Sequence, residues 1–248
     1  MPPETETAAR KHLVRSFDDD MNELTGRIAR MGGIVEKQVS DAVASLVDRD
    51  TKLADEVIER DKTVDAMEEE IDQLVIRLLA TRQPMAVDLR IIAMALKISN
   101  DLERTSDYAS GIAKRAIRLA EQPQLKPLIT IPRMAELCEE MLKDVLDAYV
   151  ARDVEKAMEV WERDTDVDAY YNSLFRELLT YIIEDPRRTQ VCIDLLFIAK
   201  NLERIGDHCT NIAENVYFLV TGRQPGGERP KGGKDDLNVA SPAKQAPQ

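Results

Sequence analysis

An internal duplication is the feature of this sequence that most restricts its fold. Residues 47–66 match residues 150–169 at an offset of 103, and both segments contain Arg-Asp, Glu-Arg-Asp and Val-Asp-Ala. Residues 96–113 match residues 196–213 at an offset of 100, and both contain Leu-Glu-Arg followed three residues later by Asp. Because two blocks recur in the same order, the chain consists of two copies of one unit, with three residues fewer between the blocks of copy two.

The apolar residues of each copy recur at the spacing of long amphipathic helices. Residues 91–119 and 191–219 each carry apolar side chains in a seven-residue seam of the coiled-coil kind. The preceding segment of copy one has the same spacing, at Leu53, Val57, Val64, Met67, Ile71, Leu74 and Leu78. A further helix before each of these segments, at about 17–48 and 131–151, completes three helices per copy.

Turn signals separate these helices. Gln83-Pro84 and Asp185-Pro186 are expected to be turns in which proline begins the next helix. Arg49-Asp50 and Arg152-Asp153 are expected to be short turns in which the aspartate is an N-cap. The sequence therefore predicts an all-α fold of six long helices, in two tandem antiparallel three-helix bundles related by pseudo-two-fold duplication.

The ends of the chain and its middle are expected to lie outside these bundles. We expect a disordered N-terminus at 1–12, repeat 1 at 13–122, a linker at 123–132, repeat 2 at 133–222 and a disordered tail at 223–248. No signal peptide and no long apolar run is visible, so a cytoplasmic location is expected. The three cysteines, Cys138, Cys192 and Cys209, lack metal-ligand spacing and are expected to be buried thiols.

Four pairs of acidic residues, each four residues apart, recur at equivalent places in the two copies. They are Asp61/Asp65 and Glu103/Asp107 in copy one, and Asp164/Asp168 and Glu203/Asp207 in copy two. Residues four apart lie on one face of a helix, where two carboxylates repel each other unless a positive charge lies between them.

The position of these pairs relative to the turns predicts that they meet. Asp65 and Glu103, and likewise Asp61 and Asp107, are centred on residue 84, so they stand at matching levels of one antiparallel hairpin. The copy-two pairs are centred in the same way on the 185–186 turn. Each hairpin thus brings four carboxylates together beside the apolar seam, where hard oxygen donors suit one cation or a cluster of cations.

A simpler interpretation competes with the metal site. An acidic helix flank is usually a solvated face, and Arg60 or Arg104 could pair with some of these acids. Recurrence at matched levels in both copies favours the metal site.

The residue types leave the identity of the ion open among Fe, Zn, Mn, Mg and Ni. The net charge of −12 disfavours binding to nucleic acid.

Three segments resemble the PhoU family of bacterial accessory proteins in phosphate signalling. They are RQPMAVDLR at 82–90, ALKISNDLERTSD at 95–107 and LLFIAKNLERIGDHCTNIAE at 195–214, and the resemblance covers about residues 13–222. Thr105-Ser106 replaces the Ile-Gly that the family pattern has between Arg and Asp, a change expected to leave the acidic positions untouched.

The resemblance implies a negative regulator of the phosphate-starvation response. Such proteins lie between the ATPase of a phosphate ABC transporter (PstB) and a phosphate-sensing histidine kinase (PhoR). They are cytoplasmic, form homodimers, and reach the membrane only through these partners. Some bind multinuclear metal clusters, including iron, at the acidic motifs, on which all eight acids named above fall.

Two other functions compete with this one. A carboxylate-bridged di-iron oxidase needs Glu-x-x-His on two helices, but His12 and His208, the only histidines, are not in such a motif, so an enzyme is not expected. Alternatively, the acids could serve a metal store or a bare helical scaffold without a signalling role. His208 follows Asp207 but aligns with Tyr108, which favours a structural role.

Overall fold

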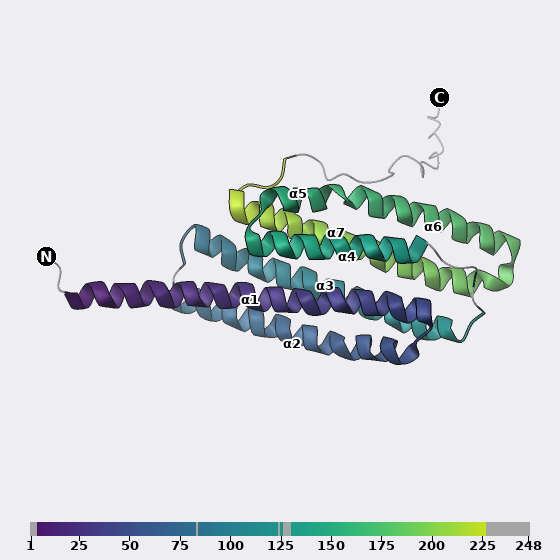
Figure 1. Ribbon diagram of the computed structural model, residues 1–248, viewed down its shortest axis with the longest axis horizontal. Coiled ribbons are helices and arrows are strands. Elements are labelled where there is room, and N and C mark those ends of the chain that lie inside the picture. Colours follow the sequence, from purple (N-terminus) through teal and green to yellow (C-terminus); the bar gives the residue numbers. More distant parts are fainter. Residues whose placement is uncertain (1–3, 83, 124, 126–129, 227–248) are drawn as a thin grey trace, which may run out of the picture.

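The computed structural model describes residues 4–82, 84–123, 125 and 130–226, and all of its regular elements are helices (Figure 1). Repeat 1 contains α1 (Glu4–Asp48), α2 (Thr51–Arg82) and α3 (Val87–Ala120). Repeat 2 contains α4 (Thr130–Ala151), α5 (Val154–Glu162), α6 (Asp164–Glu184), the short 3-10 helix η1 (Pro186–Arg188) and α7 (Thr189–Thr221). Helices α5 and α6 are separated only by Arg163 and together correspond to the single helix α2 of repeat 1. The predicted all-α fold of six helices is therefore confirmed.

The two bundles lie side by side, with α3 and α7 packed against each other between them and α1 against α4 (Figure 1). The contacts between α3 and α7 are reciprocal. His208 on α7 lies 2.8 Å from Asp101 on α3, while Asn201 on α7 donates to the backbone carbonyl of Tyr108 on α3 at 3.3 Å. Positions 101 and 201, and 108 and 208, are equivalent in the two copies, so this pattern has the pseudo-two-fold relation that the duplication predicts.

The predicted apolar seams form the core of both bundles. Every seam position of α3 from Ile91 to Leu119 is buried, and Leu102 and its counterpart Leu202 are completely inaccessible to solvent. The three cysteines are buried free thiols, as expected. Within the described residues, no helix is both long and apolar enough to cross a membrane.

The second helix predicted for repeat 2 is interrupted at Arg163, between α5 and α6, a break that the sequence pattern did not predict. The Arg163 amide bonds to the carbonyl of Val160, three residues back, and the Thr165 hydroxyl donates to the carbonyl of Glu162. A threonine hydroxyl that takes a backbone carbonyl competes with the helical hydrogen bond. Repeat 1 has Lys62 at the position of Thr165, and α2 is continuous there.

Two helix ends also differ from expectation. Helix α3 begins at Val87, so Pro84 lies in the connection before it, whereas Pro186 does begin a helix, the short η1. Helix α1 begins at Glu4, within the segment expected to be disordered. The expected tail at 223–248 lies outside the described residues from 227 onward.

The turns between the first and second helices are built alike in both repeats. Asp50 accepts hydrogen bonds from the amides of Lys52 and Leu53, and Asp153 accepts one from Lys156, so both act as the predicted N-caps. The residue before each cap, Arg49 or Arg152, has a φ of 56°, a left-handed conformation that favours glycine. These equivalent turns fix the level of each second helix against the first.

Candidate metal centre

The eight predicted ligands lie on the facing helices of the two hairpins. Asp61 and Asp65 are on α2 opposite Glu103 and Asp107 on α3, and Asp164 and Asp168 are on α6 opposite Glu203 and Asp207 on α7. In repeat 1, the carboxylates of the two helices are close enough to interact electrostatically. Partial removal from water, followed by the charges of Asp61 and Asp107, raises the pKa of Asp65.

Glu103 feels the same cluster more strongly. Burial, followed by the charge of Asp107, raises its pKa to about 7, while Arg104 opposes the rise. Glu68 and Asp65 add to the rise. Glu68 was not among the predicted ligands, although it lies on α2 one helical turn after Asp65 and its spacing could have indicated it.

The first acid of the α2 pair points into the bundle. Asp61 Oδ1 accepts hydrogen bonds from the Ser106 hydroxyl at 2.5 Å and from the Gln38 amide at 3.4 Å. Ser106 Oγ also lies 3.0 Å from Gln38 Oε1, so its single hydroxyl proton is shared between the two acceptors, and both side chains are completely buried. The substitution of Ser106 for the glycine of the family pattern therefore does affect an acidic position, contrary to expectation, because a serine hydroxyl on α3 reaches the carboxylate on α2.

Repeat 2 holds the equivalent acid with different residues. Asp164 is only 4% exposed, well inside the rim position expected from sequence, and it accepts a hydrogen bond from the Thr210 hydroxyl at 3.3 Å. Gly206 stands in place of Ser106 and lies against Val167 on α6, where a Cβ on residue 206 would come within 3.2 Å of that side chain. The glycine thus permits the close approach of α6 to α7 that accompanies the burial of Asp164.

The glutamates at the centre of each site are half-buried and incompletely bonded. Glu103 Oε2 is buried without a hydrogen bond, and the nearest guanidinium nitrogen, Nε of Arg104, is 3.5 Å away as an ion pair. Glu203 Oε1 accepts from Lys200 Nζ at 2.6 Å, and its Oε2 is equally close to that ammonium but lacks hydrogen-bond geometry. Arg104 also pairs with Asp107 at 3.2 Å, as the competing interpretation anticipated, while Arg60 instead pairs with Asp41.

The donor types fit a hard cation, but the side chains are not closed around one point. Carboxylate oxygens, among them the unbonded buried oxygen of Glu103, are the ligands that Mg²⁺, Mn²⁺ and iron accept. Among the described residues, no group of three or more His, Cys, Asp or Glu side chains is gathered tightly enough to hold a metal ion. Binding would therefore require rotation of the exposed acids, such as Asp65 and Asp107, toward Glu103.

His208 does not join either acidic group. Its Nδ1 lies 2.8 Å from Asp101, a buried carboxylate that also accepts from Asn211 and Asn215. This polar cluster links α3 to α7, and the structural role expected of His208 is thus to join the two bundles. The sequence indicated only that positions 101 and 208 differ from their counterparts Asn201 and Tyr108.

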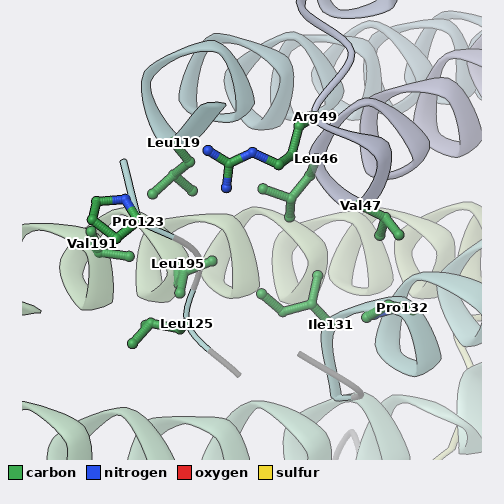
Figure 2. A pocket seen from close by; sticks show the side chains of 10 residues that line it. All are labelled: Leu46, Val47, Arg49, Leu119, Pro123, Leu125, Ile131, Pro132, Val191 and Leu195. Atoms are coloured by element: carbon green, nitrogen blue, oxygen red, sulfur yellow. The ribbon is translucent and has the colours of Figure 1, made fainter. Parts of the chain in front are cut away.

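An apolar cavity of about 150 Å³ lies away from both acidic groups, where the α1, α3 and α7 ends meet the linker (Figure 2). Its walls include Leu119, Leu125, Ile131 and Leu195. Arg49, the one charged residue among the described residues of its lining, donates to the carbonyls of Ala120 and Gln122. The cavity therefore offers little for a charged ligand, and the acidic hairpins remain the candidate site.

Comparison with known proteins places this architecture in a defined class. The family model described as "PhoU domain" matches the chain twice, at residues 28–116 and 131–216. The chain is 50% identical to the phosphate-specific transport system accessory protein PhoU homolog of Caulobacter vibrioides over 89% of this chain and 96% of that protein. It is 49% identical to the homolog of Rhizobium meliloti over 91% of this chain and 94% of that protein.

Solved structures agree with these relatives. The crystal structure of PhoU from Pseudomonas aeruginosa superposes with a TM-score of 0.81 at 40% identity, over 84% of this chain and all of that one. The phosphate transport system regulatory protein PhoU from Streptococcus pneumoniae gives a TM-score of 0.79 at 29% identity, over 84% and 99% of the two chains.

The protein is therefore of the class of all-helical accessory proteins of phosphate transport, which are not enzymes. The chain belongs to the PhoU family, with one PhoU domain in each of its two bundles.

Proposed function

We propose that this protein is a cytoplasmic negative regulator of the phosphate-starvation response. It couples the ATPase of a phosphate ABC transporter (PstB) to a phosphate-sensing histidine kinase (PhoR). The observation that carries the proposal is the match of both repeats, over about nine-tenths of the chain, to phosphate-specific transport system accessory proteins. The protein reaches the membrane through these partners and acts as a homodimer.

Exposed apolar side chains at the ends of both hairpins support a role in docking. At the α2–α3 end, Met85 is 79% exposed and Val87 48%, and at the α6–α7 end Ile183 is 81% exposed. Apolar side chains that gather at an exposed end commonly mark a surface for a protein partner. Replacing Ile183 by Asp should weaken capture of the kinase or the transporter ATPase, with the exposed Glu184→Asp change as its matched control.

Deletion of the gene in its host tests the regulatory function. At high phosphate, loss of a negative regulator should make alkaline phosphatase and the transporter genes constitutively expressed, and the intact gene should restore repression. Unchanged expression in the deletion strain would contradict the proposal and favour the metal-store or scaffold alternative. Size-exclusion chromatography with light scattering tests the homodimer separately.

We further propose that the acidic pairs bind metal ions, with Fe, Mn, Mg, Zn and Ni as the candidate elements. Support comes from the donor types and from the recurrence of the half-buried Glu103 and Glu203 at equivalent places. Replacing Asp65, Glu103, Asp168 and Glu203 together by Ala should remove bound metal, as measured by elemental analysis of the purified protein. Wild-type metal content in this variant would show that these residues are not ligands.

A further inference from the structure

The two acidic sites differ at a pair of contacting positions. Asn100 of repeat 1 aligns with Lys200 of repeat 2, and Glu68 aligns with Tyr171. In repeat 1, the Asn100 amide donates to Glu68 Oε1 at 3.3 Å. In repeat 2, Lys200 Nζ lies 5.4 Å from the centre of the Tyr171 ring. The same place beside the central glutamate thus holds an extra carboxylate in one copy and an ammonium in the other.

In repeat 2, the protein supplies its own cation. Lys200 Nζ lies 2.6 Å from both carboxylate oxygens of Glu203, the distance of a strong charge-assisted contact. The Tyr171 ring adds a further favourable contact to the ammonium. A metal ion at Glu203 would have to displace this ammonium and would meet its repulsion.

In repeat 1, no lysine takes that place. Asn100 is neutral, and the charge of Glu68 reaches Glu103 together with the charges of Asp65 and Asp107. Arg104 pairs with Glu103 at 3.5 Å and with Asp107 at 3.2 Å, whereas Arg204 of repeat 2 lies 5.5 Å from the Tyr108 ring centre. Arg104 is 51% exposed and makes no hydrogen bond to Glu103 Oε2, so it holds that glutamate more loosely than Lys200 holds Glu203 at 2.6 Å.

We propose that repeat 1 is the tighter metal site of the two, and that Lys200 lowers the cation affinity of repeat 2 by occupying the metal's place at Glu203. This inference rests on the proposed metal binding. It assigns Lys200 and Tyr171, together with their counterparts Asn100 and Glu68, as the residues that set the difference. The ligand is a hard divalent cation, for which Mn²⁺ is the probe.

Calorimetric titration of the metal-free full chain with Mn²⁺ tests the proposal. Two classes of site are expected, and Glu103→Gln should abolish the tight class while Glu203→Gln removes the weak one. Lys200→Asn should tighten Mn²⁺ binding at repeat 2 about tenfold, because one positive charge a few ångströms from the ion is removed from a partly solvated site. Asn100→Lys should weaken binding at repeat 1 by a similar factor.

Controls separate this proposal from loss of folding and from failure of metal binding itself. Lys200 is 40% exposed, so its replacement leaves the core intact, and Lys143→Asn changes the charge of the same repeat equally at another exposed lysine. Far-UV circular dichroism checks the fold of each variant. Equal affinities at both repeats, or unchanged affinity in Lys200→Asn, would overturn the asymmetry while metal binding stands. Absence of any Mn²⁺ binding would overturn both.

Discussion

Asp61 in repeat 1 and Asp164 in repeat 2 occupy equivalent positions, yet they are held by different groups. Gln38 and Ser106 hold Asp61, whereas Thr210 holds Asp164. The counterparts of Gln38 and Ser106 in repeat 2 are Met141 and Gly206, which have no polar side-chain atom to offer. The comparison shows that a duplicated helical framework preserved its backbone pattern while the environment of each carboxylate diverged.

The framework and the environment can be separated experimentally. If the framework is symmetric, equivalent core changes should cost the two repeats equally. If the environments differ, exchange of polar neighbours should affect one repeat alone.

The largest expected effect is on the shared core. Leu102→Ala and Leu202→Ala each remove a fully buried seam side chain and should destabilise the protein by about 3 kcal/mol. Urea unfolding followed by circular dichroism measures both. A difference of more than about 1 kcal/mol between them would show that the two cores are not equally packed.

Thiol labelling adds a local measurement to this prediction. All three cysteines lie in repeat 2, and burial raises the pKa of the Cys138 and Cys209 thiols. They should react with a thiol reagent only when repeat 2 opens. If the repeats open independently, Leu202→Ala should speed labelling more than Leu102→Ala does. Equal acceleration would indicate that both open together.

The buried polar network of repeat 1 should show the next largest effect. Gln38→Met and Ser106→Gly introduce the residues of repeat 2, and each should cost about 1–3 kcal/mol because buried partners lose hydrogen bonds. The double variant should cost less than the sum of the two, since both changes remove the same Gln38–Ser106 bond. Strict additivity in chemical denaturation would argue against a coupled network.

The raised pKa of Glu103 predicts a pH dependence of stability in metal-free protein. Its carboxyl has a pKa of about 7 in the folded chain against 4.5 ordinarily, so the folded state holds the proton more firmly. Stability should therefore fall as pH rises from about 4.5 to 7, by on the order of 1 kcal/mol once solvent screening is allowed for.

Thermal unfolding of wild type and Glu103→Gln across this range measures that contribution. The variant should flatten the profile, while Glu69→Gln, an exposed change on α2, should leave it as in wild type. Identical profiles for wild type and Glu103→Gln would assign the pH dependence to other groups.

The smallest effect is expected at the equivalent left-handed turns. Arg152→Gly should stabilise the protein by about 1 kcal/mol, because glycine adopts positive φ without strain. Arg49→Gly should gain less, since Arg49 also donates to the carbonyls of Ala120 and Gln122. Differential scanning calorimetry compares them, and an equal gain would show that those two hydrogen bonds contribute little.

Much of the fold was predictable because it depends on local pattern. The seams of α3 and α7, the aspartate caps and the level of the acidic pairs all follow from helical spacing and turn position. The break at Arg163 was not, because the aligned segment of repeat 1 has the same apolar pattern and is continuous in α2.

The candidate site was predictable only in part. The sequence placed the eight acids on facing helices, and their role as metal ligands remains a prediction. It did not indicate that Asp61 binds Gln38, because that residue lies 23 positions away on a third helix. Nor did the sequence indicate that Ser106 contacts an acidic residue, although the packing of α3 against α2 brings its hydroxyl to Asp61.

The duplication, the family and the six helices, apart from the start of α1 and the break at Arg163, were thus determined by the sequence alone, because periodicity and recurrence are properties of the chain itself. Tertiary structure decided which acids turn inward, which cation lies at Glu203, and that Asp101 and His208 join the bundles. The physical reason is that helical spacing fixes only the face on which a side chain lies. Which groups meet on that face depends on how three helices pack, and in the central contact on how two bundles pack.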